Sequence, residues 1–132
     1  EVDPRFSTEP WKAGQWLKDE ALTTLGVTRD EAMLIPLLGG MFMGVCLSHE
    51  RSRRWMNAFL RICQDGHTLV GALRNVNNSV SSDPRCLGHV ADQAVAAVLA
   101  HRYGMPLTNP PVWRDWHRQE PDARTVIVAR GM

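Results

Sequence analysis

Two segments of this chain combine apolar side chains with a high density of small residues. Residues 37–47 are apolar on all sides and include three glycines, and residues 87–103 include five alanines, which allow neighbours to approach a helix from both sides. A helix that is apolar all round has to be covered on every side. Both segments are therefore expected at the centre of the protein, as helices around which the rest of the chain packs.

The chain length and the residue pattern predict one domain over residues 1–132. A chain of this size forms a single core, and the sequence contains no internal repeat. The predicted fold is mainly α: a single-domain bundle of four to six helices with a short C-terminal β segment. Residues 1–7 are expected to form an extended arm. Residues 105–132 form a Pro/Trp-rich tail, in which residues 125–129 have β character.

Helix signals divide the first third of the chain. Thr8 can cap a first helix over residues 8–25, which Gly26 would end in a left-handed conformation. Thr28 and Glu31 form a Thr-x-x-Glu capping box immediately before an apolar run, which predicts a second helix start. Pro36 lies inside that run and should kink or break the helix near position 35.

Two longer helices are predicted farther along. Asp83 and Pro84 mark the start of one, and Gly104 marks its end. Ser48 is expected to cap the other, over residues 49–64, which is strongly amphipathic. On a helical wheel its apolar arc holds Trp55, Met56, Phe59, Leu60, Ile62 and Cys63.

Composition limits the location of the protein and its partners. No apolar run reaches the roughly 20 residues that span a bilayer, so no transmembrane segment is predicted in this chain. The net charge of +1 provides no global field that would attract nucleic acid. Three cysteines cannot all pair, which favours reduced thiols and a cytoplasmic location, alone or as the cytoplasmic part of a larger protein. A first residue other than methionine indicates a processed protein or a domain of a longer one.

Each cysteine is followed by a histidine three or four residues later. Thiolate and imidazole are ligands that zinc prefers, and residues at this spacing share one face of a helix. The alternative is that the cysteines are small buried hydrophobes, since no Cys-x-x-Cys occurs, and then no cofactor is expected. The zinc hypothesis names six candidate ligands: Cys46, His49, Cys63, His67, Cys86 and His89.

Cys86 also raises the hypothesis of a nucleophile. It would lie in the first turn of the helix that starts after Pro84, where the pKa of a thiol is lowered, with His89 or His101 as the base. No third orienting group and no catalytic sequence motif accompany them. The sequence therefore favours a protein that is not an enzyme, and His101 is interpreted as a core histidine.

Arginines gather on the polar face of the helix predicted over residues 49–64. Guanidinium groups bind carboxylates two at a time and also bind phosphates, so an acidic protein surface and nucleic acid are both candidate partners. The simpler interpretation is a solvated face. The candidate binding residues here are Arg51, Arg54 and Arg61.

The tail offers a second candidate docking surface. Trp113, Arg114 and Trp116 are of the types that dominate interface hot spots, although the tryptophans could also wrap the core. The sequence as a whole favours a non-enzymatic protein-interaction or adaptor domain, or a component of a larger assembly. The alternatives are a zinc-binding helical protein that uses the Cys/His pairs and a nucleic-acid binder that uses the arginine-rich helix.

Overall fold

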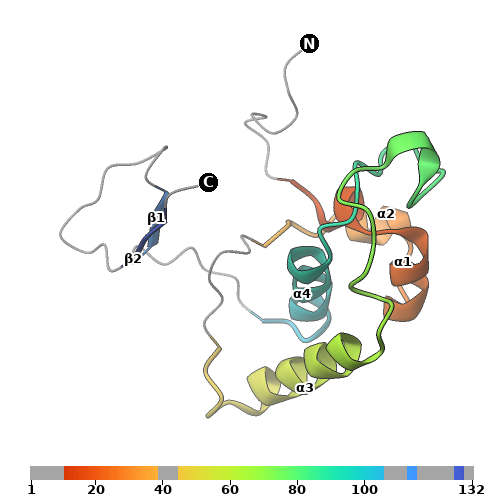
Figure 1. Cartoon of the computed structure of the whole chain (residues 1–132). Coiled ribbons are helices and arrows are strands. Elements are labelled where there is room, and N and C mark those ends of the chain that lie inside the picture. The colour runs from red at the N-terminus through yellow and green to blue at the C-terminus, as the bar shows by residue number, and fades with distance from the viewer. Residues whose placement is uncertain (1–10, 39–44, 106–112, 116–126, 130–132) are drawn as a thin grey trace.

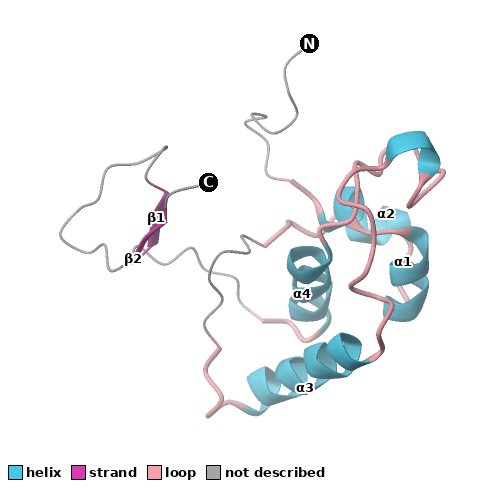
Figure 2. Ribbon diagram, in the orientation of Figure 1, coloured by secondary structure: helices cyan, strands magenta, loops and turns pink. Residues whose placement is uncertain are grey.

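The fold is mainly helical in the parts of the chain that the structure describes. The structure is a computed structural model, and it describes residues 11–38, 45–105, 113–115 and 127–129. Figures 1 and 2 show the arrangement of the elements. The helices are α1 (Asp19–Leu25), α2 (Arg29–Met33), α3 (Glu50–Gln64) and α4 (Ala91–Arg102), with the short 3-10 helices η2 (Ala13–Trp16) and η3 (Val76–Asn78).

Helix α4 is the core of the described fold. Residues 94–100 are buried without interruption, because η2 packs against α4 on one side and α3 on another. The Trp55 indole donates a hydrogen bond of 3.2 Å to the carbonyl of Ala96, and the Trp55 ring stacks on Phe59 with centroids 5.3 Å apart. Small side chains allow this close approach. The central position predicted for the alanine-rich helix is confirmed.

The start predicted for this helix is wrong, whereas its end is confirmed. Residues 83–90 form turns and extended chain, and α4 begins only at Ala91. The cause is a tertiary contact. The N–H groups of Leu87 and Val90 donate to carbonyls of η2 and are therefore not part of a continuous helix. Gly104 has φ +58°, the left-handed conformation that stops the helix.

The helix predicted over residues 8–25 is interrupted within its described part. Leu17 and Lys18 are extended between η2 and α1. The carbonyls of Gln15 and Trp16 accept hydrogen bonds of 2.8 and 3.1 Å from Leu87 and Val90, so they are not used by a continuous helix. Gly26, at φ +61°, ends α1 as predicted.

The capping box and the proline break are confirmed. The Thr28 hydroxyl accepts from the Glu31 N–H at 3.1 Å, and the Glu31 carboxylate accepts from the Thr28 N–H at 2.7 Å. Helix α2 ends at Met33, and Pro36 then pairs with Lys12 in an isolated antiparallel bridge.

The buried helix predicted over residues 37–47 is wrong for its described ends. Residues 37–38 and 45–47 are not helical, and Leu47 is 53% exposed. After the break at the proline, the Leu37 N–H donates to the Trp11 carbonyl at 2.7 Å, which holds the chain extended. Residues 39–44 lie outside the described part.

Helix α3 matches the predicted range within one residue. Its N-cap is His49 rather than Ser48, and no side chain caps it. The face toward α4 is narrower than the predicted arc: Trp55 is buried, but Leu60 is 48% exposed and Cys63 is also exposed. Met56, Phe59 and Ile62 of the predicted arc are partly buried against the core.

The C-terminal part contains one short strand pair. Strand β1 (Trp113–Asp115) pairs in parallel with β2 (Ile127–Ala129). Two strands of three residues are marginal on their own in water, so the predicted β segment remains a prediction. The expected arm over residues 1–7 lies outside the described residues.

A buried arginine, which no sequence pattern predicted, joins the first elements of the fold. Arg29, 9% exposed, donates to the carbonyls of Gly14 and Leu17, to the Asp19 carboxylate at 2.6 Å and to the Ser81 hydroxyl at 3.2 Å. Partial burial raises the pKa of Asp19, but the hydrogen bonds from Ser81 and Arg29 outweigh this effect and hold the pKa below its ordinary value. One guanidinium therefore joins η2, α1 and the loop before α4.

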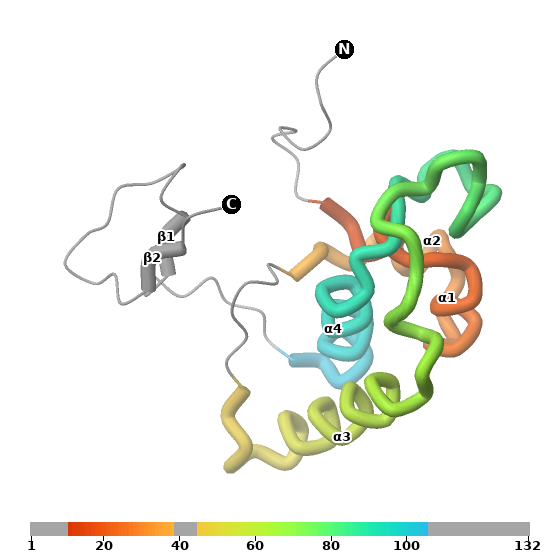
Figure 3. Tube along the Cα trace, in the orientation of Figure 1, coloured from red at the N-terminus to blue at the C-terminus, as the bar shows by residue number. Residues whose placement is uncertain are grey.

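A buried histidine fastens the long connection between α3 and α4, which Figure 3 traces past α1. His89 is 4% exposed, and its Nδ1 accepts a hydrogen bond of 3.2 Å from the Lys18 N–H. The proton therefore sits on Nε2, which donates to the Thr68 carbonyl at 2.9 Å. Burial lowers the pKa of His89, and the positive charge of Lys18 adds to this effect.

Replacing Arg29 with methionine should strongly destabilise the protein. The substitution leaves the carbonyls of Gly14 and Leu17 without their donor, and each buried unsatisfied group costs roughly 1–3 kcal/mol. We expect urea denaturation to show a loss of at least about 2 kcal/mol in the free energy of unfolding. The matched control is Arg74→Met at an exposed loop arginine, with a change within about 0.5 kcal/mol. Equal midpoints for the two variants would contradict this role for Arg29.

Acidification should destabilise the protein through His89. Because the folded state lowers the pKa of His89 below 6.5, the unfolded chain binds a proton first as the pH falls. The free energy of unfolding should therefore decrease below about pH 6.5. Urea denaturation at pH 7.5 and pH 5.5 measures this decrease. The decrease in the free energy of unfolding should be smaller in His89→Gln. It should persist in the control His67→Gln, which changes an exposed histidine. The reverse pattern would show that His89 is not the source of the decrease.

Candidate interaction site at the start of helix α3

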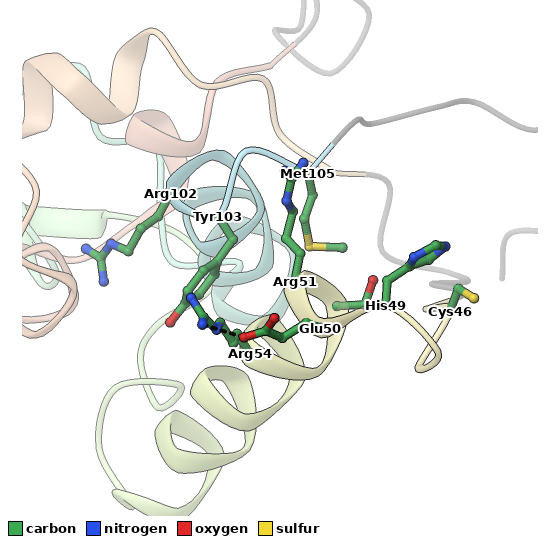
Figure 4. A pocket seen from close by; sticks show the side chains of 9 residues that line it. Cys46, His49, Glu50, Arg51, Arg54, Arg102, Tyr103 and Met105 are labelled. Carbon is green, nitrogen blue, oxygen red and sulfur yellow. Dashed lines mark hydrogen bonds and ion pairs between the residues drawn. The ribbon is translucent and has the colours of Figure 1, made fainter.

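The candidate site is a pocket of about 820 Å³ where the start of α3 meets the end of α4. Figure 4 shows its lining side chains. The loop before α3 and the first turns of this helix contribute Cys46, His49, Glu50, Arg51, Ser52 and Arg54, and the end of α4 contributes Arg102, Tyr103 and Met105.

The packing of α3 on α4 places the arginines at this pocket. With 3.6 residues per turn, the side chains that cover α4 leave Arg51 and Arg54 on one flank of α3. Arg51 donates a hydrogen bond of 2.7 Å to the carbonyl of Gly104. That carbonyl belongs to the left-handed turn that ends α4. The helix stop and the arginine flank therefore form one side of the pocket together.

The pocket is positively charged. Three arginines against one glutamate leave a formal charge of +2 with His49 neutral. Arg54 forms an ion pair with Glu50 one turn earlier, and both side chains are exposed, at 66% and 68%. Figure 4 shows Tyr103 extending toward this pair, whereas the Arg102 guanidinium points away from it. Arg102 donates instead to the Leu25 carbonyl.

Cys46 and His49, one of the predicted Cys/His pairs, both line this pocket. Cys46 is exposed, and its Sγ lies 3.0 Å from the Ser48 hydroxyl. Hydrogen bonding from the Ser48 hydroxyl and N–H lowers the pKa of this thiol. The structure thus brings one candidate metal pair next to the candidate binding arginines.

The second Cys/His pair is exposed and lies at the end of α3. Cys63 is in the last turn of the helix. His67 follows the turn at Gly66, and its Nδ1 is 2.9 Å from the Asp65 carbonyl. Within the described ranges, no three His, Cys, Asp or Glu side chains are grouped so that they could hold a metal ion. Zinc binding remains a prediction.

The third pair, Cys86 and His89, is buried. The Cys86 thiol donates to the Leu17 carbonyl at 3.4 Å, and both ring nitrogens of His89 are engaged by backbone groups. Burial raises the pKa of the Cys86 thiol. The expected helix start that would lower this pKa is absent, because α4 begins at Ala91. The nucleophile hypothesis loses its physical basis, and His101 is exposed rather than in the core.

Among the other predicted binding residues, Arg61 lies apart from the pocket. Arg61 is exposed on α3, two turns beyond Arg54 and about 10 Å farther along the axis. Trp113 and Arg114 belong to β1, whose side chains are outside the described part, and Trp116 lies outside it altogether. Docking through the tail therefore remains a prediction.

The pocket residues at the end of α4 were not predicted. Arg102, Tyr103 and Met105 surround the predicted helix stop at Gly104, which was the only local signal near them. Only the tertiary contact between α3 and α4 turns this helix end into the wall of a pocket.

In the described part of the chain, no helix has both the length and the apolar character that crossing a membrane requires. The chain matches no protein-family model, no curated protein and no solved structure.

Proposed function

We propose that this chain is a non-enzymatic protein-interaction domain that binds an acidic segment of a partner protein on the arginine flank of α3. One observation carries the proposal. Five of the nine residues that line the pocket are arginine, tyrosine or methionine, which are types enriched at protein interfaces. They are Arg51, Arg54, Arg102, Tyr103 and Met105.

The charge of the flank favours an acidic partner. Arginine binds carboxylates through parallel hydrogen bonds. Arg54 already pairs with the Glu50 carboxylate through one terminal nitrogen. Arg61 extends the positive strip beyond the pocket. From Arg51 to Arg61 the strip is about 15 Å long, so an extended peptide of five residues would follow it.

Helix α3, which carries Arg51 and Arg54, is anchored to the core. Trp55 fixes α3 to the backbone of α4, and Phe59 stacks on Trp55. Binding then costs little ordering of the backbone, and preorganisation of this kind improves affinity.

The proposal also includes the helix bundle, the tail and the cellular location that the sequence predicts. The domain would be a bundle of four to six helices whose Pro/Trp-rich tail, residues 105–132, adds a second docking element. All three cysteines are unpaired thiols, which supports a cytoplasmic location.

Binding of an oligoglutamate peptide tests the proposal. An eight-residue fluorescent oligoglutamate should bind the full 132-residue chain, with an affinity that falls as salt rises. Fluorescence anisotropy should show at least a tenfold loss of affinity in Arg51→Glu/Arg54→Glu, because each change reverses a charge that contacts the peptide. The single variant Arg74→Glu is the control at an exposed arginine outside the pocket, and it should retain most of the affinity.

Two outcomes would reject this function. The first is equal loss of affinity in Arg74→Glu and in the pocket variant, which would indicate a general charge effect. The second is preferential binding of a single-stranded oligonucleotide of equal length through the same arginines, which would favour the nucleic-acid alternative.

A further inference from the structure

The pocket at the start of α3 holds more positive charge than one carboxylate can neutralise. Arg51 and Arg54 share the pocket with a single acidic residue, Glu50, whereas the Arg102 guanidinium points away and donates to the Leu25 carbonyl. Each described contact of these arginines uses one terminal nitrogen of a guanidinium that has five donor hydrogens. The guanidiniums of Arg51 and Arg54 therefore have donors left for a ligand.

Glu50 forms an ion pair with Arg54, but this ion pair is weak. The pair spans one turn of α3, and both side chains are more than 60% exposed. Exposed ion pairs of this kind contribute little to stability, so a more highly charged anion can displace the Glu50 carboxylate. A ligand with a single carboxylate would only exchange one carboxylate for another.

We propose that this pocket binds the dianionic phosphoryl group of a phosphorylated serine or threonine in the partner segment. The inference rests on the proposed function and specifies the chemistry that the partner must carry. A phosphoserine or phosphothreonine carries a charge of about −1.5 to −2 at neutral pH, which matches the two guanidiniums of Arg51 and Arg54 once the ligand displaces Glu50. Its oxygens accept parallel hydrogen bonds from guanidinium forks.

The shape of the pocket suits a phosphoryl group attached to a peptide. Its volume of about 820 Å³ leaves room for the residues next to the phosphorylated one. Tyr103 and Met105 provide apolar surface for such neighbours, and Figure 4 places Tyr103 beside Arg54 and Glu50. The first turn of α3 lacks a side-chain cap, and its dipole adds to the attraction that the arginines exert.

A phosphomonoester fits this arrangement better than a nucleic-acid strand does. A strand carries one negative charge on each phosphate and spreads these charges along its length. Arg51 and Arg54 lie only three residues apart on one face of the helix, and both side chains are exposed, so both can turn from Gly104 and Glu50 toward one ligand. A single group with two charges satisfies both guanidiniums at once.

The test compares three peptides with the full chain. They share one sequence, in which the central residue between two leucines is phosphoserine, glutamate or serine, and the ends are acidic. Isothermal titration calorimetry should show the phosphoserine peptide binding at least tenfold more tightly than the glutamate peptide, and the serine peptide binding most weakly.

Two variants and two controls locate the phosphoryl group. Arg54→Ala should abolish the preference for phosphoserine, whereas Arg61→Ala, two turns away, should preserve it. Glu50→Gln should strengthen phosphopeptide binding severalfold, because it removes the competing carboxylate. Asp92→Asn is the matched control at the start of α4, and it should leave the affinity unchanged. Circular dichroism melting verifies that each variant is folded.

The outcomes separate this inference from the proposed function. Equal binding of the phosphoserine and glutamate peptides, with dependence on Arg54, would overturn the inference and leave the acidic-partner function standing. Tighter binding that survives Arg54→Ala would also overturn it, because the phosphoryl group would then lie elsewhere. If neither the three peptides nor oligoglutamate binds, both proposals are wrong.

Discussion

The burial of α4 on every side is the constraint on which the rest of the structure depends. Alanine and valine side chains let η2 and α3 approach its backbone, and the Trp55 hydrogen bond to the Ala96 carbonyl fixes how α3 crosses it. This crossing places the first turn of α3 beside the left-handed turn at Gly104. The packing of the core therefore brings the exposed residues Arg51 and Arg54 next to the end of α4, and this forms the pocket.

Local signals in the sequence predicted much of the helical framework. The capping box at Thr28, the stops at Gly26 and Gly104 and the amphipathic pattern of α3 all act within a few residues, and each is confirmed. They succeed because caps and periodicity are properties of the isolated segment. The position of Arg51 and Arg54 on the exposed face of this helix was also predicted and is confirmed, whereas their role in binding stays a prediction.

The failures share one physical cause, which is the use of backbone groups by distant segments. The helices expected over residues 8–25 and from Asp83 are both interrupted where Gln15 and Trp16 pair with Leu87 and Val90. No local pattern encodes such a pairing. The buried hydrogen bonds of Arg29 and His89 also join residues far apart in sequence. The same is true of the contact that makes the end of α4 part of the pocket.

Arg29 differs from Arg51 and Arg54 in the acceptors that its guanidinium contacts. The terminal nitrogens of Arg29 serve carbonyls, a carboxylate and a hydroxyl in the protein interior, so its charge is committed to the fold. The side chains of Arg51 and Arg54 are exposed, and each makes one contact. A buried cation surrounded by fixed acceptors cannot bind a ligand without unfolding its surroundings, whereas an exposed one can exchange a weak internal partner for an external anion. This difference, more than the number of positive charges, is why we propose the start of α3 as the place that recognises an acidic partner.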